Sequence, residues 1–315
     1  MKILFFGSSD FSVPFLREFK NSKHIISLVI TGIDKIRGRG KKSLPNPVKE
    51  AAVNSGYNFL EIESFSGKII GAILKFNFDC IVLISFGKIL PKQLLNSLPG
   101  SCINVHPSLL PKYRGPSPII STLLNGDKKT GISIIKMTEK VDEGDIFLQS
   151  EFAVSDDDNK DLLEEKLIKI GVPLLFSVLD LIEDGKIETF PQNNKLAIYT
   201  NLFNKDDLKI NWNLNAEKII NKVRAFSTSP GSYTNWRGKN IKIIKAKKIE
   251  NLNYKIFPGN TNGEIISASK KDGLLVRCNK KEIIKIELLK PQDKNIMYAV
   301  DFINGYPVKI GDIFE

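Results

Sequence analysis

The sequence predicts an α/β protein with two domains: a Rossmann-like domain on a mostly parallel sheet, followed by a smaller OB-like β-barrel. Three observations support this prediction. The chain has 315 residues, more than one ordinary hydrophobic core holds. Short apolar runs alternate with helical patterns over residues 1–188. Beyond residue 207, short β-rich runs separated by turn residues take their place.

The first domain, residues 1–188, is expected to contain six strands and at least four helices. Apolar or β-branched runs predict the strands at Lys2–Phe6, Ile25–Ile30, Asp79–Ser85, Cys102–Val105, Ile132–Met137 and Ile146–Phe152. Apolar residues at helical spacing predict the helices around Phe11–Phe19, Pro47–Ser55, Ser66–Phe76 and Leu162–Glu183. Strands and helices that alternate in this way predict a mostly parallel sheet that is covered on both faces.

Regular patterns lapse over residues 189–207, which we interpret as a linker between domains. Residues 208–315 then form the expected second domain. An amphipathic pattern predicts a helix at Ala216–Phe226. Turn residues separate the expected strands at Ile241–Ala246, Gly263–Ser267, Gly273–Cys278 and Ile283–Leu289. Such short strands favour an OB-like barrel, a fold that often binds nucleic acid.

The positive charge of the chain is concentrated in this second domain. The net charge is +11, and residues 205–315 hold 21 Lys and Arg against 12 Asp and Glu, a net of +9. The first 204 residues, with 25 basic and 23 acidic residues, contribute only +2. A polyanionic partner is therefore one interpretation of the second domain. The alternative is a Lys-rich surface that only maintains solubility.

Composition also bears on location and on metals. The three cysteines, Cys80, Cys102 and Cys278, are far apart and odd in number. This pattern argues against a disulfide framework and a zinc site, and it is typical of the reducing cytoplasm. No apolar run reaches the ~18 residues that a membrane helix needs. We therefore expect a cytoplasmic protein that has no metal and no membrane contact.

The chemistry is expected in Ser101–Asp145. Asn104 and His106 alternate with apolar residues near the end of a buried strand, so both should point to the same face of the sheet. Ligands of open parallel sheets bind beyond the carboxyl ends of the strands. The other histidine, His24, stands beside Lys23 and is expected at the surface. His106 is thus the main candidate for an acid or base, although a lone buried histidine is more often structural.

The string NVHPSLLPKYRG, which starts at Asn104, resembles the signature of formyltransferases that use 10-formyltetrahydrofolate. In this family the string is followed by an Asp in a V/L-D-x-G turn, and here that residue is Asp142. An uninterrupted string with a matching acid is much more specific than a short motif. The resemblance implies that Asn104, His106 and Asp142 are the catalytic residues.

These residue types suit formyl transfer on chemical grounds. When an amine attacks a formyl carbon, the tetrahedral oxyanion needs hydrogen-bond donors, and an Asn amide and an imidazolium are such donors. A neighbouring carboxylate such as Asp142 can hold the imidazole charged. It can also help to move a proton from the amine to the departing nitrogen of tetrahydrofolate. No step of this scheme requires a metal.

The resemblance also implies a pocket for the folate co-substrate. Ser85–Pro91 resembles the loop that lines this pocket in the family, and the segment after His106 resembles its SLLP loop. The expected folate contacts are Phe86, Gly87, Lys88, Ile89, Leu90, Ser108, Leu109, Leu110 and Pro111. The alternative for Ser85–Pro91 is an ordinary turn between a strand and a helix.

The catalytic signature is shared by family members with different acceptors, so other segments must indicate the acceptor. Asp34–Pro47 is a basic, Gly-rich insertion that resembles the loop with which members acting on methionyl-tRNA grip the acceptor stem. Its phosphate-binding candidates are Arg37, Arg39, Lys41 and Lys42. A solvated loop without a partner is the alternative.

The second domain carries two further resemblances. Val223–Tyr233, VRAFSTSPGSY, resembles the family segment I-R-A-F-x-P-x-P-G-A-Y and makes Arg224 a candidate tRNA contact. Asp301–Phe314 resembles the family ending. Ser8 and Ser9 depart from the Thr-Pro of the usual N-terminal motif. We therefore expect a monomer that formylates initiator methionyl-tRNA. The alternatives are a family member acting on a sugar nucleotide or another small amine, and an inactive RNA-binding relative.

Overall fold

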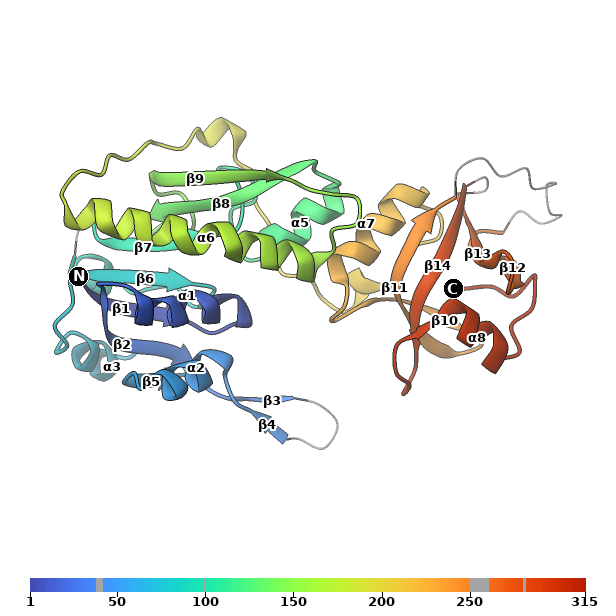
Figure 1. Cartoon of the computed structure of the whole chain (residues 1–315), viewed down its shortest axis with the longest axis horizontal. Coiled ribbons are helices and arrows are strands. Elements are labelled where there is room, and N and C mark those ends of the chain that lie inside the picture. Colours follow the sequence, from blue (N-terminus) through green and yellow to red (C-terminus); the bar gives the residue numbers. More distant parts are fainter. Residues whose placement is uncertain (38–41, 99, 250–260, 280–281) are drawn as a thin grey trace. The chain divides into compact units, whose positions relative to one another are not determined.

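The computed structural model describes residues 1–37, 42–98, 100–249, 261–279 and 282–315. The chain forms two compact units (Figure 1). The first unit consists of Met1–Pro118, Lys129–Ala153 and Glu164–Asn201. The second consists of Ile119–Lys128, Val154–Leu163 and Leu202–Glu315. In the described ranges, none of the helices combines the length and the apolar character needed to cross a membrane.

The first unit is built on a seven-stranded sheet of order β5-β2-β1-β6-β7-β8-β9. The first five strands in this order pair in parallel, whereas β8 pairs antiparallel with both of its neighbours, β7 and β9. The strands are β1 (Lys2–Gly7), β2 (Ile25–Gly32), β5 (Phe59–Ile62), β6 (Cys80–Ile84), β7 (Cys102–His106), β8 (Lys129–Lys136) and β9 (Ile146–Ala153). The predicted mostly parallel sheet is thus confirmed.

The apolar central strands are explained by helices on both faces of this sheet. Successive residues of a strand point to opposite faces. On one face, Phe6 lies in a cluster with Ile70 and Ile73 of α3. On the other, Phe5 contacts Phe19 beside α1, and α1 and α6 lie over this face (Figure 1). A strand with both faces covered must be apolar throughout.

Local signals account for several of the helices. Asn46 caps the N-terminus of α2, where Pro47 takes the first helical position, and Gly56 ends the helix with φ +73°. The helices of the first unit and its borders are α1 (Val13–Glu18), α2 (Pro47–Ser55), α3 (Gly67–Ile73), α4 (Lys92–Leu95), α5 (Pro118–Asn125) and α6 (Lys160–Glu183). Short 3₁₀ turns are found at Asp10–Ser12, Phe19–Asn21, Asn194–Leu196 and Asp206–Leu208.

The basic insertion forms a hairpin of two short antiparallel strands, β3 (Lys35–Arg37) and β4 (Lys42–Leu44), in which Arg37 pairs with Lys42. Figure 1 shows this hairpin extending away from α2. At its base, the Asp34 carboxylate accepts a hydrogen bond from the Asn46 amide at 2.9 Å. Asp34 also forms an ion pair with Lys49 at 2.8 Å, so charged contacts hold the base of the hairpin to α2.

The second unit contains an antiparallel sheet of order β10-β11-β14-β13-β12, with β15 paired to β14. Its elements are α7 (Ala216–Phe226), β10 (Ser232–Trp236), β11 (Lys239–Lys248), β12 (Ile265–Ser269), β13 (Gly273–Cys278), β14 (Glu282–Pro291), β15 (Met297–Tyr298) and α8 (Ala299–Gly305). The apolar face of α7, including Ile219 and Val223, shares a core with Trp212, Trp236 and Phe302. The predicted smaller β domain is therefore confirmed.

Candidate active site

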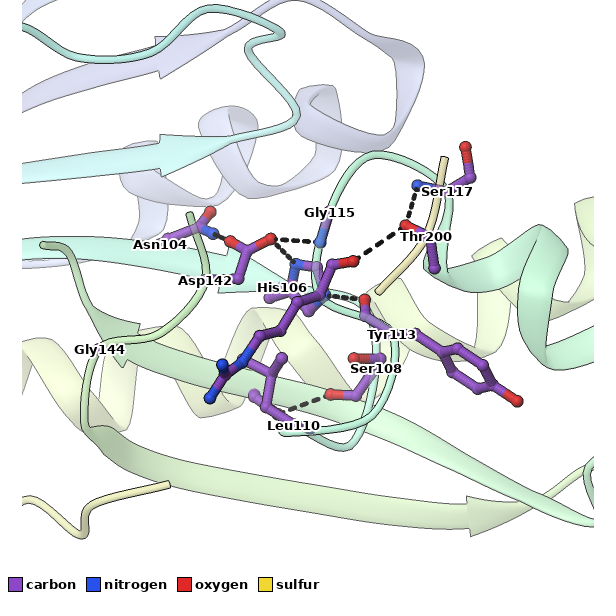
Figure 2. A network of polar contacts seen from close by, with 12 residues as sticks. Asn104, His106, Ser108, Leu110, Tyr113, Gly115, Ser117, Asp142, Gly144 and Thr200 are labelled. Carbon is purple, nitrogen blue, oxygen red and sulfur yellow. Dashed lines mark hydrogen bonds and ion pairs between the residues drawn. The ribbon is translucent and has the colours of Figure 1, made fainter. Parts of the chain in front are cut away.

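One strand and one turn bring Asn104, His106 and Asp142 together, as Figure 2 shows. Asn104 and His106 both lie on β7, two residues apart, and are 9% and 4% exposed. Asp142 belongs to the turn between β8 and β9, residues 137–145, which we call the β8–β9 turn. The Asn104 Nδ2 atom donates to Asp142 Oδ1 at 2.9 Å. The sequence therefore predicted a set of side chains that meet in space.

The Asp142 carboxylate is the centre of this group. Its Oδ2 atom accepts a hydrogen bond from the Gly115 amide at 2.8 Å and lies 3.5 Å from His106 Nδ1 (Figure 2). The backbone of Asp142 has φ +54°, which costs of order 1 kcal/mol for a residue other than Gly. Such a conformation persists only when surrounding contacts hold it. The carboxylate is thus held by both of its oxygens and by its backbone.

The hydrogen bonds of His106 restrict its tautomer. The Nε2 atom lies 2.9 Å from the carbonyl oxygen of Tyr113, which can only accept, so Nε2 carries a proton. Nδ1 then faces Asp142. In the neutral ring its lone pair would point at a carboxylate, whereas in the imidazolium it would carry a second N–H toward Asp142.

The segment after His106 is braced by a polar cluster beneath it. Ser133 of β8 donates to the Ser108 carbonyl at 2.6 Å and accepts from the Leu110 amide at 3.1 Å. Gln149 of β9 donates to Ser133 Oγ at 2.7 Å and to the Leu110 carbonyl at 2.9 Å. These contacts fix the loop that places the Tyr113 carbonyl and the Gly115 amide around His106 and Asp142.

A cavity of about 120 Å³ opens beside Asn104 and Asp142. Its wall is mostly apolar and comes from the end of β6, the following loop and the β8–β9 turn. The other lining residues are Leu83, Lys88, Ile89, Leu90, Leu95, Ile135, Lys136, Met137, Thr138, Glu139, Lys140, Val141 and Gly144. Apolar walls with a few polar groups at one end are typical of sites for small ring-shaped molecules.

The predicted folate contacts divide into two groups. Lys88, Ile89 and Leu90 line this cavity, and Ile89 is 74% exposed. Phe86 is buried in the core cluster that contains Phe6, and Gly87 takes a left-handed turn with φ +74°. The predicted contacts after β7 do not line this cavity in the described structure: Ser108, Leu109, Leu110 and Pro111.

Sequence reasoning missed the contribution of residues 135–141 to this cavity, although their position directly before the V-D-x-G turn was an available signal.

Sequence reasoning also missed a buried network around Arg114, which is 1% exposed. The Arg114 guanidinium donates to Gln192 and Asn194 and to the Tyr199 hydroxyl. A hydrogen bond from that hydroxyl keeps the pKa of Glu143 below its usual range. No local pattern in the sequence indicated these long-range contacts.

The predicted tRNA contacts are placed to different degrees. Arg37 and Lys42 lie on the paired strands of the basic hairpin, and Arg39 and Lys41 lie outside the described residues. Arg224 of α7 donates to the carbonyl oxygens of Asp158 at 2.6 Å and Ser155 at 2.7 Å, both in the second unit. Burial lowers the pKa of the Arg224 guanidinium from its usual value.

One group of possible metal ligands occurs among the described residues. His24, Asp180 and Glu183 bring ligand atoms within 4.8 Å of one another at the amino-terminal end of β2. Lys23 Nζ lies 3.0 Å from Asp180 and 2.9 Å from Glu183. Because the Lys23 ammonium pairs with both carboxylates, and the Met1 ammonium pairs with Glu183 at 2.8 Å, this group carries no metal assignment. His24 is buried, contrary to the expected surface position.

Comparison with solved structures identifies the same fold in a protein solved with tetrahydrofolic acid and in a sugar formyl transferase. HypX from Aquifex aeolicus, solved with tetrahydrofolic acid, matches 100% of this chain and 50% of its own, with TM-score 0.66 and 15% identity. WlaRD, a sugar 3N-formyl transferase solved in the presence of dTDP and 5-N-formyl-THF, matches 94% of this chain and 99% of its own, with TM-score 0.64 and 20% identity.

Sequence comparison gives the stronger result. The family described as formyl transferase matches residues 1–179, and the formyl transferase C-terminal domain matches residues 203–307. The methionyl-tRNA formyltransferase of Dictyoglomus thermophilum is 39% identical over 100% of both chains. The enzymes of the same name from Fusobacterium nucleatum and Bacillus subtilis are 37% and 35% identical and cover 99% of this chain, with 99% and 97% of their own length matched. The chain belongs to the formyl transferase family.

Proposed function

We propose that this chain transfers the formyl group of 10-formyltetrahydrofolate to the α-amino group of methionine on initiator methionyl-tRNA. The observation that carries the chemistry is the contact of Asn104, His106 and Gly115 with one carboxylate, that of Asp142. The name shared by relatives over the full length of this chain supports the acceptor.

The folate co-substrate fits the cavity beside Asn104 by its chemistry. A pterin ring has two apolar faces and a polar edge, and the cavity offers apolar side chains such as Ile89, Leu90 and Val141 with main-chain groups around them. Asn104 and Asp142 are polar residues of its wall. We therefore place the ring against the apolar wall and the formyl group next to Asn104.

Asn104 and His106 are the proposed donors to the oxyanion. One amide hydrogen of Asn104 is used on Asp142, and the second is left for the oxygen of the formyl group. When His106 is doubly protonated, its Nδ1–H lies 3.5 Å from Asp142, longer than the ~2.7–2.9 Å of a strong charge-assisted bond, and we propose that this N–H also donates to the developing oxyanion. Each such donor is worth about 3 kcal/mol of barrier.

Asp142 is the proposed proton carrier and orienting acid. During transfer, the amine nitrogen bonds to the formyl carbon and loses a proton, while the bond from that carbon to the folate nitrogen breaks and this nitrogen gains a proton. A carboxylate has four lone-pair positions, and three contacts of Asp142 are described. The remaining capacity allows Asp142, directly or through water, to pass the proton between the two nitrogens.

Charge supports a tRNA acceptor over a small amine. The basic hairpin and the net charge of +9 over residues 205–315 can neutralise phosphates of a large polyanion. A sugar nucleotide needs neither feature. We propose that Arg37, Arg39, Lys41 and Lys42 contact the acceptor stem, that Arg224 contributes from the second unit, and that a monomer acts in the cytoplasm, where charged tRNA is found.

The test is an assay with purified chain, 10-formyltetrahydrofolate and three acceptors: methionine-charged initiator tRNA, methionine-charged elongator tRNA, and a nucleotide-linked amino sugar. We expect formyl-methionine on the initiator tRNA, and a monomer by light scattering. Product on the amino sugar alone would favour the sugar-nucleotide alternative. Binding of tRNA without any product would favour an inactive RNA-binding relative.

A further inference from the structure

A segment far along the chain runs beside the proposed catalytic residues. Residues 190–200, which we call the strap, form main-chain hydrogen bonds with two loops of the first unit. The amide and carbonyl of Phe190 both pair with Ile146 at the end of the β8–β9 turn, at 2.9 and 2.8 Å. The Arg114 amide donates to Ile198, and its carbonyl accepts from Thr200, each at 2.8 Å. The strap therefore connects the loop after β7 to the β8–β9 turn.

Within the strap, Gln192 contacts the backbone of the turn that carries Asp142. Its Nε2 atom donates to the carbonyl oxygen of Asp142 at 2.8 Å and to that of Gly144 at 2.7 Å. Both hydrogens of the amide are thus used on one turn. The main-chain carbonyl of Asp142, whose carboxylate is the proposed reacting group, is thus held by a side chain 50 residues away in the sequence.

The orientation of Gln192 is set from the opposite side by Arg114. The Gln192 Oε1 atom accepts from Arg114 Nε at 3.1 Å and from Nη2 at 2.8 Å. The guanidinium is itself fixed, because it also donates to Asn194 at 2.6 Å and to the Tyr199 hydroxyl at 2.9 Å. A flipped Gln192 amide would place its NH₂ against the guanidinium and its oxygen against two carbonyls. The guanidinium thus permits only one orientation of the amide.

The turn needs such support. Asp142 has φ +54°, a left-handed conformation that L-residues adopt rarely and hold only under external contacts. At Gly144, a Cβ atom would collide with the Lys136 carbonyl oxygen, so the backbone of the turn packs closely against Lys136 there. In this conformation the Asp142 carboxylate contacts Asn104, His106 and the Gly115 amide.

We propose that Gln192 is a positioning residue for formyl transfer, which holds the Asp142 turn in its strained conformation through two hydrogen bonds oriented by Arg114. This proposal rests on the proposed function of the Asp142 site. Gln192 acts through the Asp142 backbone, and its loss should lower the rate of the chemical step while substrate affinities remain. The competing explanation is that Gln192 only satisfies the buried charge of Arg114.

The variant Gln192→Glu separates the two explanations. A glutamate keeps oxygen acceptors for Arg114 and adds a charge pair, but it cannot donate to the carbonyls of Asp142 and Gly144. We expect the single-turnover rate at saturating substrates to fall at least tenfold, with Kd for folate and for tRNA within twofold of the original. The Tm should fall only slightly, because one carboxylate oxygen then faces the carbonyls of Asp142 and Gly144. The matched control is Asn193→Ala. Asn193 is an exposed strap residue whose side chain accepts a hydrogen bond from the Lys195 amide, and its replacement should leave the rate unchanged.

A second readout does not depend on activity. The Gly115 amide donates to Asp142, so its hydrogen exchange reports where the carboxylate is. In Gln192→Glu we expect faster exchange in peptides that contain Gly115, and in Asn193→Ala no change. Gln192→Leu, which removes both sets of contacts, should show the same faster exchange together with a lower Tm.

The outcomes also separate this proposal from the proposed function. If the original chain produces no formyl-methionine on tRNA, the proposed function fails, while the exchange measurement still tests Gln192. If the original chain is active, and Gln192→Glu keeps its rate within twofold and its Gly115 exchange unchanged, the positioning role is wrong. Gln192 would then serve Arg114 alone.

Discussion

The β8–β9 turn and the basic hairpin are built in opposite ways. The turn holds Asp142 through side chains from β7, a loop amide and the strap, and its central carboxylate is 10% exposed. The hairpin has two three-residue strands, with charged contacts at its base through Asp34. A dense network defines geometry at a reacting centre, whereas a hairpin with cationic side chains suits a large anionic surface.

Under the proposed function, chemistry and choice of acceptor are separable in this chain. The turn has to hold atoms within a fraction of an ångström, so buried contacts from distant segments converge on it. The hairpin has to supply charge, and charge acts at a distance that depends on salt. Changes in the turn should therefore affect kcat, and changes in the hairpin should affect KM for tRNA.

The largest effect is expected from Asp142→Asn. This change removes the charge that faces His106 Nδ1 and the acceptor for the amine proton, so kcat should fall by about 10²–10³. The single-turnover rate and Kd for tRNA are the measurements, and Kd should stay within twofold. A rate within a factor of three of the original would remove Asp142 from its catalytic role.

A smaller effect, on the other region, is expected from Arg39→Ala. Loss of one phosphate contact should raise KM for tRNA by about five- to tenfold without changing kcat, and should reduce the slope of log K against log salt by about one. Steady-state kinetics at several salt concentrations check this. Lys20→Ala, an exposed cation in the same unit, is the control and should leave the salt dependence as it was. An unchanged KM in Arg39→Ala would favour a solvated loop.

The base of the hairpin should give a smaller effect on KM for tRNA. A hydrogen bond from Lys49 and another from the Asn46 amide hold the pKa of the Asp34 carboxyl below its usual value of 3.8. The contact is therefore complete above pH ~4 and is lost only as the pH falls through the lowered pKa. We expect Asp34→Asn to raise KM for tRNA about two- to fivefold at pH 7 with kcat unchanged. A fall in kcat alone would show that the hairpin base and the turn are coupled.

The thiol at the start of β7 tests the rigidity of the strand and not the activity. Burial raises the pKa of Cys102 to about 11, and burial likewise raises the pKa of Cys278 to about 12 and that of Cys80 well above its usual value. The reactive thiolate is thus scarce at pH 8. Alkylation by iodoacetamide, followed by mass spectrometry, should be at least tenfold slower than at an exposed control thiol made by Val53→Cys. Fast labelling of Cys102 would mean that β7 opens, against a rigid frame for Asn104 and His106.

Much of the fold follows from local signals in the sequence. Helix α2 begins at Pro47 and α7 at Ala216, as predicted, because Asn46 and Asn215 each cap the helix that follows them. The weak strand β5 and the short strands of the hairpin were missed, since too few residues carry a pattern there. The expected linker over residues 189–207 showed only a lack of periodicity, which gives no information about long-range contacts.

The candidate site was predictable where its residues form one string and not where they meet across the chain. Asn104 and His106 share a strand face, so alternation alone placed them together. Asp142 was found through the family pattern. Gln192 and Arg114 are 78 residues apart, and their contact depends on the fold of everything between them. The cavity wall from the β8–β9 turn was missed because the loop conformation decides which side chains face inward.

The strap also bears on how the chain can be divided for recombination. A catalytic fragment that ended at residue 188 would lack Gln192, whereas the first compact unit continues to Asn201. When C-terminal domains are exchanged between relatives, the crossover should therefore lie after Asn201, so that the Asp142 turn keeps its hydrogen bonds from Gln192 of the same chain. The boundary that matters for engineering is set by one glutamine and not by the end of the last long helix.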